Sequence, residues 1–308
     1  MKCVVTGGCG FIGSHLLDRL VQLGHEVVVV DDLSTGDDSL LNPEVSLLEG
    51  SVTDLELLVS ATKGADWVFN TAAWARVERS VSDPVGTHDV NVTGTLNVLQ
   101  AARLNGVSKV INSSSSSVYG DQGRRHVMRE DMKPNPLSPY AVQKLVGEQY
   151  AEMYARLFDM RVISLRYFNV YGPRQRAGGA YPLVIPKFLQ LRRQNEPLTI
   201  YGDGNQTRGY THVSDVVDAN LRAAAADLLA GHHIALNVGP REETSVNEIA
   251  ALIGGPVRHI FPNPRGDFEE FRKCADNSLA MELIGWEPVI SFREGMKGLL
   301  VSEALERS

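Results

Sequence analysis

Short apolar runs alternate with longer amphipathic segments through the first two-thirds of the chain. The runs are rich in valine and isoleucine and lack a polar alternation, which is typical of strands buried on both faces of a parallel sheet. They cover residues 2–6, 27–31, 45–49, 67–70, 109–113 and 162–166. The amphipathic segments between them predict helices over 11–23, 55–61, 85–104 and 140–157. This order predicts an α/β fold, in which right-handed crossovers build a doubly wound parallel sheet.

The alternation ends after Gly172-Pro173, where glycine, proline and long polar connections become more frequent. We therefore expect a smaller C-terminal substrate-binding lobe, made of residues 173–207 and 233–308. The larger domain would comprise 1–172 and 208–232, and the segment 210–226 would return the chain to it. The doublet His232-His233 is interpreted as a loop, because no acidic residue or cysteine accompanies it at the spacing of metal ligands. The sequence predicts no metal site.

The composition is that of a globular protein with room for a core: 308 residues, 43% hydrophobic and 22% charged. Against 37 Asp and Glu there are 30 Lys and Arg, a net charge of −7, and no basic tract, so nucleic acid is not an expected partner. No apolar run approaches the ~18 residues of a membrane span, and the first strand leaves no room for a signal peptide. The three cysteines form no Cys-x-x-Cys motif and fit a reducing compartment, so we expect a cytoplasmic protein.

A glycine-rich loop lies between the first predicted strand and the first predicted helix. Gly7 permits the tight turn, Gly10 lets a pyrophosphate approach the backbone, and Gly13 lets the helix pack closely on the strand. The anion would then meet the free N–H groups of the helix N-terminus. Asp31 ends the second strand, where its carboxylate would accept hydrogen bonds from ribose hydroxyls and repel a 2′-phosphate. The pattern predicts a Rossmann fold that binds NAD rather than NADP, and Cys9 is interpreted as a small filler in the loop.

A second group of polar residues suggests acid–base chemistry beside this cofactor. Tyr140 and Lys144 stand at i and i+4 on one face of a helix that Ser138 and Pro139 begin. A run of serines over 113–117 ends the fifth strand, at the edge of the sheet where ligands bind in such folds. A free tyrosine has a pKa of about 10, so a tyrosine base needs that pKa lowered. Lys144 and a positive nicotinamide ring would do so by favouring the phenolate.

Nearly the whole chain resembles the extended short-chain dehydrogenase/reductase family, and within it the nucleotide-sugar 4-epimerases. The matching motifs are TGGCGFIGSH (6–15), VVVVDDLSTG (27–36), NVTGTLNVLQAAR (91–103), SSSSSVYG (113–120), SPYAVQK (138–144), RYFNVYGPRQ (166–175) and YGDGNQTR (201–208). The resemblance implies that Ser115 is the catalytic serine, Tyr140 the acid/base and Lys144 its activator. It also implies a reaction in which C4 of a UDP-sugar passes its hydride to tightly bound NAD, and a 4-keto intermediate turns over and takes the hydride back on its other face.

The resemblance also implies a set of binding residues. For the cofactor these are Gly7, Gly10, Phe11, Ile12, Gly13, Asp31, Asp32, Ser34, Thr35, Gly36, Ser51, Val52, Ala72, Ala73, Asn91, Ser113, Tyr140, Lys144, Tyr167 and Phe168. For the UDP-sugar they are Ser115, Tyr140, Asn169, Val184, Tyr201, Arg208, Arg265 and Asp267.

Three departures from the family pattern stand out. Ser51 replaces an aspartate near adenine, Asn70-Thr71 replace His-Leu, and the C-terminal segment is longer, so that Arg272 could bind the diphosphate instead of Arg265.

Other reactions stay open to different degrees. A 4,6-dehydratase would carry Asp-Glu where Ser116 and Ser117 stand, and these hydroxyls cannot replace the carboxyl groups that expel water. A UDP-glucuronate 4-epimerase, a UDP-uronate decarboxylase and a UDP-N-acetylhexosamine 4-epimerase remain alternatives. An NAD-binding scaffold without catalysis is disfavoured, because such a protein needs none of Ser115, Tyr140 and Lys144.

The substrate expected first is a neutral UDP-hexose such as UDP-glucose or UDP-galactose, with UDP-glucuronate second and UDP-N-acetylglucosamine third. Lys273 stands where relatives place a residue that limits pocket size, and a lysine would crowd an acetamido group. Arg76 and Lys273 together would suit a C6 carboxylate, although we interpret each as a loop residue at the surface, and Trp286 as core. The resemblance further implies a homodimer, with the helices over 85–104 and 140–157 paired across a two-fold axis as a four-helix bundle.

Overall fold

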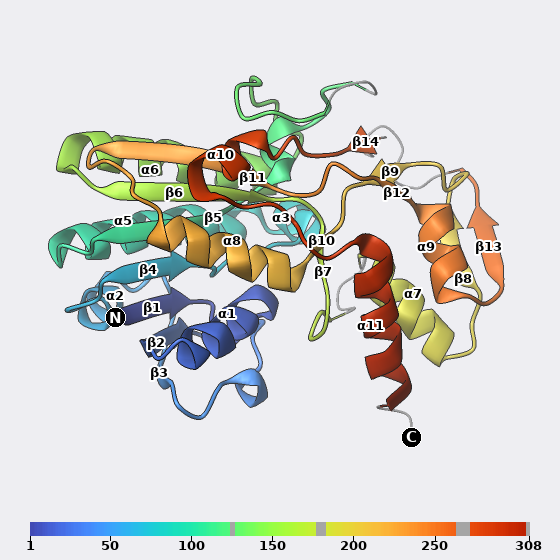
Figure 1. Cartoon of the computed structure of the whole chain (residues 1–308), viewed down its shortest axis with the longest axis horizontal. Coiled ribbons are helices and arrows are strands. Elements are labelled where there is room, and N and C mark those ends of the chain that lie inside the picture. The colour runs from blue at the N-terminus through green and yellow to red at the C-terminus, as the bar shows by residue number, and fades with distance from the viewer. Residues whose placement is uncertain (124–126, 177–182, 263–271, 306–308) are drawn as a thin grey trace.

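A seven-stranded, fully parallel sheet forms the centre of the computed structural model, which describes residues 1–123, 127–176, 183–262 and 272–305. The strands are β1 (Lys2–Thr6), β2 (Glu26–Asp31), β3 (Ser46–Glu49), β4 (Trp67–Asn70), β5 (Lys109–Ser115), β6 (Arg161–Tyr167) and β11 (His232–Val238). Their order across the sheet is β11-β6-β5-β4-β1-β2-β3 (Figure 1). The chain therefore reverses direction across the sheet between β1 and β4, and the predicted doubly wound α/β fold is confirmed.

The interpretation of His232-His233 as a loop is wrong. The two histidines are the first residues of β11, opposite Arg161 and Val162 of β6. The His233 ring lies 2.9 Å from the hydroxyl of Ser164 on β6. This strand is at the edge of the sheet and begins with polar residues, so it lacks the apolar signature of the central strands. The domain boundary predicted at residue 232 consequently falls at the start of a sheet strand.

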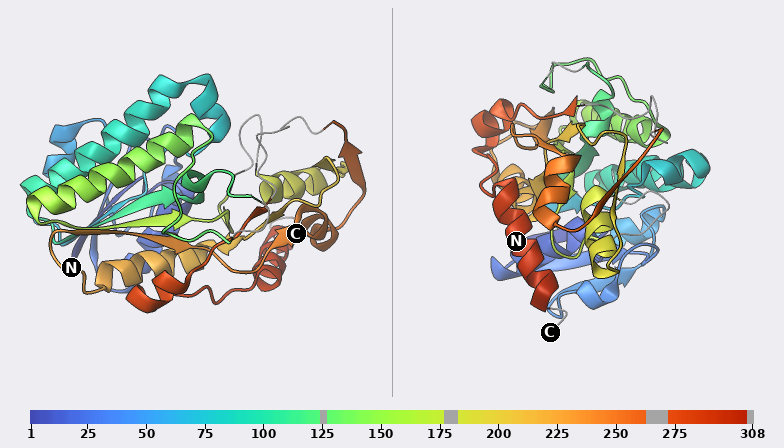
Figure 2. Two further views of the ribbon diagram at one scale, coloured as in Figure 1. Left: turned by 90° about the horizontal axis from the view of Figure 1, so that it is seen from above. Right: turned by 90° about the vertical axis from the view of Figure 1, so that its right-hand side faces the viewer.

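Helices cover both faces of the sheet (Figure 2). On one face lie α2 (Leu55–Ala61), α5 (Gly94–Leu104) and α6 (Pro139–Phe158). On the other lie α1 (Phe11–Gln22), α8 (Val213–Ala225) and α10 (Ser278–Ile284). Each face has its own buried cluster of aliphatic side chains. Trp286 belongs to the cluster beneath α1 and α8 and is fully buried, as expected, and its indole N–H donates to the carbonyl of Asp215 at 2.9 Å.

The helix predicted over 85–104 is interrupted. It consists of α4 (Pro84–His88), a π-helical turn η2 (Asp89–Thr93) and α5. A short helix, α3 (Val77–Ser82), precedes it, and the carboxylate of Asp83 caps α4 by accepting from the Gly86 N–H at 2.9 Å. The π-helical turn inserts Asn91 among the residues around the site described below. Such single turns of wider helix are frequent at functional sites.

The C-terminal lobe has a separate core that includes residues of α7 (Val184–Arg193) and α9 (Val246–Ile253) and the early turns of α11 (Phe292–Leu305). Its strands are short: β8 (Leu198–Tyr201) pairs with β13 (Val257–Ile260), and β9 (Thr207–Arg208) lies between β12 (Thr244–Ser245) and β14 (Arg272–Lys273). The pair β7 (Val170–Tyr171) and β10 (Thr211–His212) lies between this lobe and the central sheet (Figure 1). None of the helices described is both long and apolar enough to cross a membrane.

Candidate active site

The glycine loop after β1 has the geometry that a diphosphate requires. Gly7 has φ of +71°, and its N–H donates to the carbonyl of Val30 at 2.8 Å, which holds the loop against β2. A Cβ on Gly13 would lie 2.2 Å from the carbonyl oxygen of Gly7, so no larger residue fits there. Gly10 is the N-cap of α1, and because it has no side chain it leaves the first-turn N–H groups open. The loop therefore fits the phosphates of a dinucleotide.

Asp31 joins the end of β2 to this loop. Its carboxylate accepts from the N–H of Cys9 and from the N–H of Leu33, both at 2.9 Å. Burial raises the pKa of Asp31, and these two hydrogen bonds oppose the rise. A carboxylate has about four lone-pair positions, so two remain for ribose hydroxyls. Burial also raises the pKa of the Cys9 thiol to about 11, which agrees with its interpretation as a filler.

A small cavity of about 70 Å³ lies between the loops that follow β1, β2 and β4. Ten of its lining residues are predicted cofactor contacts: Gly7, Gly10, Asp31, Asp32, Ser34, Thr35, Gly36, Val52, Ala72 and Ala73. Five others were not predicted: Val30, Gly50, Thr71, Trp74 and Val90. Thr71 and Trp74 follow the end of β4, a position that could have pointed to them. Ser51 instead accepts hydrogen bonds from the N–H and hydroxyl of Thr53, at 3.2 and 3.0 Å.

Ser115, Tyr140 and Lys144 come together at the carboxyl end of β5. Ser115 ends that strand and caps η3 (Ser116–Tyr119), its hydroxyl lying 3.0 Å from that of Ser117. Tyr140 and Lys144 lie in the first two turns of α6, and the Lys144 ammonium donates to the Ser113 carbonyl at 2.8 Å and lies 6.0 Å from the centre of the Tyr140 ring. Each of the three residues is less than a tenth exposed.

Burial changes the proton affinities of this group. It raises the pKa of Tyr140, a rise that the hydrogen bond with Ser115 opposes. It lowers the pKa of Lys144 to about 8, and Glu148 opposes that change. The lowering of the Tyr140 pKa that a general base needs is therefore not supplied by the described residues, since their net effect is a rise.

A layer of buried polar residues holds the catalytic helix in place. The N–H of Tyr140 donates to the hydroxyl of Ser80 on α3 at 3.0 Å, and the Ser138 hydroxyl caps the helix by accepting from Ala141 at 3.2 Å. The amide of Asn91 donates to Gln143 on α6 at 2.8 Å.

The Tyr167 hydroxyl lies 3.1 Å from that of Ser113. Asn91, Ser113 and Tyr167 thus use their side chains within the protein, and their contact with cofactor stays a prediction. The Phe168 side chain is wholly buried and packs against Tyr119.

The predicted substrate residues lie on separate elements toward the C-terminal lobe. Asn169 follows β6 with φ of +34°, and its amide donates to the carbonyl of Gly209 at 2.9 Å. Arg208 is on β9, and Val184 and Tyr201 are the first residue of α7 and the last of β8. Arg265 and Asp267 lie outside the described residues. Arg272 forms an ion pair with Glu243, and that contact occupies its guanidinium.

The interpretation of Lys273 as a surface loop residue is wrong: it lies in β14 opposite Arg208 and is 7% exposed. Arg76 is the residue before α3, and one guanidinium nitrogen donates to the carbonyl of Arg176 at 3.2 Å. The other terminal nitrogen of Arg76 is buried without a hydrogen-bond partner among the described residues.

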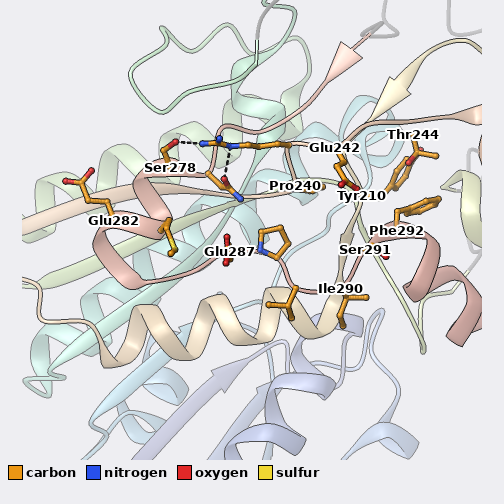
Figure 3. Close-up of a pocket in the computed structure, with 15 residues that line it drawn as sticks. Tyr210, Pro240, Glu242, Thr244, Ser278, Glu282, Glu287, Ile290, Ser291 and Phe292 are labelled. Carbon is orange, nitrogen blue, oxygen red and sulfur yellow. Dashed lines mark hydrogen bonds between the residues drawn. The ribbon is translucent and has the colours of Figure 1, made fainter.

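A larger cavity, of about 640 Å³, has a different lining (Figure 3). Ser278 and Glu282 of α10 form one end of it, and Tyr210, Thr244 and Phe292 form the other. Arg241 lines it but is held by Asp276 at 3.0 Å and by the hydroxyl of Ser278. None of the predicted site residues lines this cavity.

The model of the NAD-dependent epimerase/dehydratase family matches residues 3–239, which include the glycine loop, Asp31, Ser115, Tyr140 and Lys144. The chain belongs to this family. The prediction of NAD as the cofactor is confirmed at the level of the family, as is the resemblance to nucleotide-sugar epimerases. A structure of UDP-glucose 4-epimerase from Thermus thermophilus, which has 32% identity and a TM-score of 0.88 and covers 99% of both chains, is a complex with NAD.

Within the family, the similar proteins include several with epimerase names. A UDP-glucose 4-epimerase of Mycolicibacterium smegmatis is 41% identical over 96% of both chains. A putative UDP-glucose 4-epimerase of Methanocaldococcus jannaschii is 38% identical over 96% of this chain and 95% of its own. The Thermotoga maritima UDP-glucose 4-epimerase, solved with UDP-glucose, has 34% identity and a TM-score of 0.93 over the full length of both chains.

Family members with other reactions are also similar. A UDP-N-acetyl-α-D-glucosaminuronate decarboxylase of Bacillus cytotoxicus is 34% identical over 96% of both chains. The structure of a UDP-glucuronic acid 4-epimerase of Bacillus cereus, with UDP-glucuronic acid and NAD, has 29% identity and a TM-score of 0.88, and covers 99% of this chain and 100% of its own. The names of these relatives thus share a UDP-sugar, whereas the reactions that they name differ.

Proposed function

We propose that this protein is an NAD-dependent isomerase that inverts C4 of a UDP-hexose through a transient 4-keto intermediate. The observation that carries the proposal is the meeting of Ser115, Tyr140 and Lys144 at the same edge of the sheet as the glycine loop and Asp31. The relatives named UDP-glucose 4-epimerase favour a neutral hexose. Dehydration is disfavoured, because Ser116 and Ser117 carry no carboxyl group.

The residues present suit the cofactor and the proton transfers. The loop amides from Gly7 to Gly13 would hold the diphosphate of NAD, and Asp31 a ribose. When bound, NAD supplies a hydride acceptor for C4 and a positive ring that lowers the pKa of Tyr140. Tyr140 removes the proton from the sugar 4-hydroxyl and returns it when the keto group is reduced. Ser115 holds the sugar oxygen, and the Lys144 ammonium, fixed by the Ser113 carbonyl, favours the phenolate.

For the substrate we propose the residues that follow β6 and line the C-terminal lobe. The Arg208 guanidinium suits a diphosphate because its fork binds two oxygens at once. Asn169 would contact the sugar nucleotide, and Val184 and Tyr201 the nucleotide. Arg265 and Asp267 stay predictions, and Arg272 is the weaker candidate because Glu243 already occupies it.

A UDP-uronate is the second candidate substrate, and one observation favours it. The terminal nitrogen of Arg76 that is buried without a partner among the described residues would gain a charged acceptor from a carboxylate. The relatives acting on uronic acids point the same way. A UDP-N-acetylhexosamine ranks third, since buried Lys273 leaves little freedom to move aside.

The test is a substrate panel combined with one substitution. UDP-glucose, UDP-glucuronate and UDP-N-acetylglucosamine are each incubated with the protein, and products are followed by NMR. We expect UDP-galactose from UDP-glucose, and Tyr140→Phe should lose about 10²–10⁴-fold in turnover, because only the ionisable oxygen is removed. Tyr154→Phe, further along α6, is the control and should keep its activity.

A Tyr140→Phe variant that retains a third of the wild-type rate would eliminate Tyr140 as the base. A wild-type protein that holds NAD but converts none of the three sugars would instead favour the scaffold without catalysis.

We further propose a cytoplasmic location and a homodimer. The first rests on three cysteines that are all buried and unpaired, and the second on the large apolar side chains exposed on α5 and α6.

A further inference from the structure

The backbone of Trp74 is held in place on the loop after β4, where the residue lines the cofactor cavity. The side-chain amide of Asn91 pairs with both polar atoms of the Trp74 backbone. It accepts from the N–H at 2.9 Å and donates to the carbonyl at 3.2 Å. Asn91 is 1% exposed and is itself tied to Gln143 of the catalytic helix at 2.8 Å. The position of Trp74 is therefore set by the same π-helical turn that braces α6.

The indole ring joins two walls of that cavity. Its N–H donates to the hydroxyl of Ser34, on the loop after β2, at 3.3 Å. The guanidinium of Arg79, on α3, lies over the ring 3.2 Å from its centroid, in a cation–π contact. The Arg79 contact anchors the ring to α3, and the hydrogen bond to Ser34 links the loop after β4 to the loop after β2. Trp74, Ser34 and Asp31 all line the same cavity.

The Trp74–Ser34 contact narrows the groove in which we place the dinucleotide. The cavity there measures about 70 Å³, whereas small-molecule sites usually measure ~300–1,000 Å³. A bound nucleotide would therefore need more room than the cavity offers between Trp74 and Ser34. The Trp74–Ser34 hydrogen bond is long and exposed, so it is the contact that breaks most easily, whereas the Asn91 and Arg79 contacts keep the ring nearby.

We propose that Trp74 is a latch on the cofactor groove, which opens to admit NAD and then slows its release. The inference rests on the proposed location of NAD in this groove. Slow release of NAD suits the proposed reaction, because the hydride returns to the same cofactor molecule and the enzyme does not need to exchange NAD between turnovers. The latch acts on cofactor exchange and leaves the chemistry at Tyr140 untouched.

The experiment measures exchange of bound NAD for isotope-labelled NAD by mass spectrometry on the intact holoprotein. Trp74→Ala should release NAD about 10–100 times faster than wild type, because the release rate carries most affinity changes. Trp74→Phe keeps an aromatic ring over the groove but loses the indole N–H and one of its two fused rings, so its release should be intermediate; it also serves as the second variant if Trp74→Ala fails to fold. Ser34→Ala should also accelerate release, and in the Trp74→Phe background it should add nothing, because both changes remove the same hydrogen bond.

Two further variants separate the latch from the site itself. Trp67→Phe, on β4 at the opposite end of the strand, is the matched control and should exchange NAD at the wild-type rate. Asp31→Asn should accelerate release whether or not the latch exists. Normal exchange in Trp74→Ala together with fast exchange in Asp31→Asn would overturn the latch and leave the site intact. Wild-type exchange in both variants would overturn the location of NAD in this groove, and the latch with it.

Discussion

At the scale of single residues, burial acts on Tyr140 and Lys144 in opposite directions. It raises the pKa of the tyrosine and lowers that of the lysine to about 8, so in both cases the neutral form is favoured. The lysine nevertheless remains mainly charged at neutral pH. Because its ammonium is held by the Ser113 carbonyl, the charge stays beside the phenol at a fixed distance.

The pH dependence of kcat/KM should report the protonation of Lys144. Below about pH 8 Lys144 is protonated and favours the phenolate; above it the charge is lost, so kcat/KM should fall as pH rises. In Lys144→Arg the cation does not titrate in this range, so the variant should be slower but should lack that alkaline limb. Profiles of kcat/KM for both proteins from pH 6 to about 10 test this. The same limb in Lys144→Arg would assign it to another group.

The residues of the site that the sequence predicted are those with a local signal. Gly7, Gly13 and Asp31 are fixed by the strand–loop–helix pattern that surrounds them. Ser80 and Trp74 were missed, because their roles depend on partners distant in the chain: Ser80 accepts from Tyr140, and Trp74 is held by Asn91. Nothing in the spacing of a serine or a tryptophan indicates which distant backbone atom it will meet.

At the scale of elements, α6 carries a buried acidic residue, Glu148, one turn beyond Lys144. Glu148 accepts two hydrogen bonds from Arg166 of β6, at 2.9 and 2.7 Å, and one from Ser114 of β5. Both members of the ion pair are 6% exposed. The pair therefore ties the catalytic helix to the two strands beneath it, and it opposes the loss of charge on Lys144.

Breaking the Glu148–Arg166 ion pair should lower the stability of the fold. Arg166→Met leaves the Glu148 carboxylate buried without its cation, and the free energy of unfolding should fall by about 3–5 kcal/mol. Arg156→Met removes the exposed partner of Glu152 on the same helix and should change it by less than about 0.5 kcal/mol. Urea denaturation of the three proteins measures both values. Equal stabilities for the two variants would show that the buried pair contributes no more than a surface contact.

The elements themselves were predictable where one stretch of chain carries the signal. Six of the seven sheet strands are apolar enough to be found, whereas β11 begins with two histidines at the sheet edge and was not. The helix over 85–104 has a continuous helical pattern, but residues 89–93 form a π-helical turn in which Asn91 contacts Trp74 and Gln143, both distant in the chain. Strands such as β9 and β14 are two residues long and exist only through pairing with distant segments.

At the scale of the whole molecule, α5 and α6 lie side by side on the outside of the sheet (Figure 2), and large apolar side chains on both helices are exposed. Leu104 is 52% exposed on α5, and Met153 and Leu157 are 48% and 65% exposed on α6. Phe158 is 42% exposed at the end of α6, with the Arg103 guanidinium 4.6 Å from its ring centroid, so the two helices meet there. Large side chains gathered on two adjacent helices mark an interaction surface more strongly than single exposed ones.

A second copy of the chain suits this face, because an isologous contact would pack the same helix pair against itself. We expect the wild-type protein to sediment as a dimer and Leu157→Glu to sediment as a monomer, since the new carboxylate would be buried in the interface without a partner. Leu283→Glu is the matched control: Leu283 is 43% exposed on α10, which covers the opposite face of the sheet, so that variant should stay dimeric. A wild-type monomer at micromolar concentration, or dissociation of the Leu283 variant alone, would place the interface elsewhere. Because the proposed interface covers α6, which carries Tyr140 and Lys144, the Leu157→Glu monomer should also unfold at a lower urea concentration than the wild-type dimer.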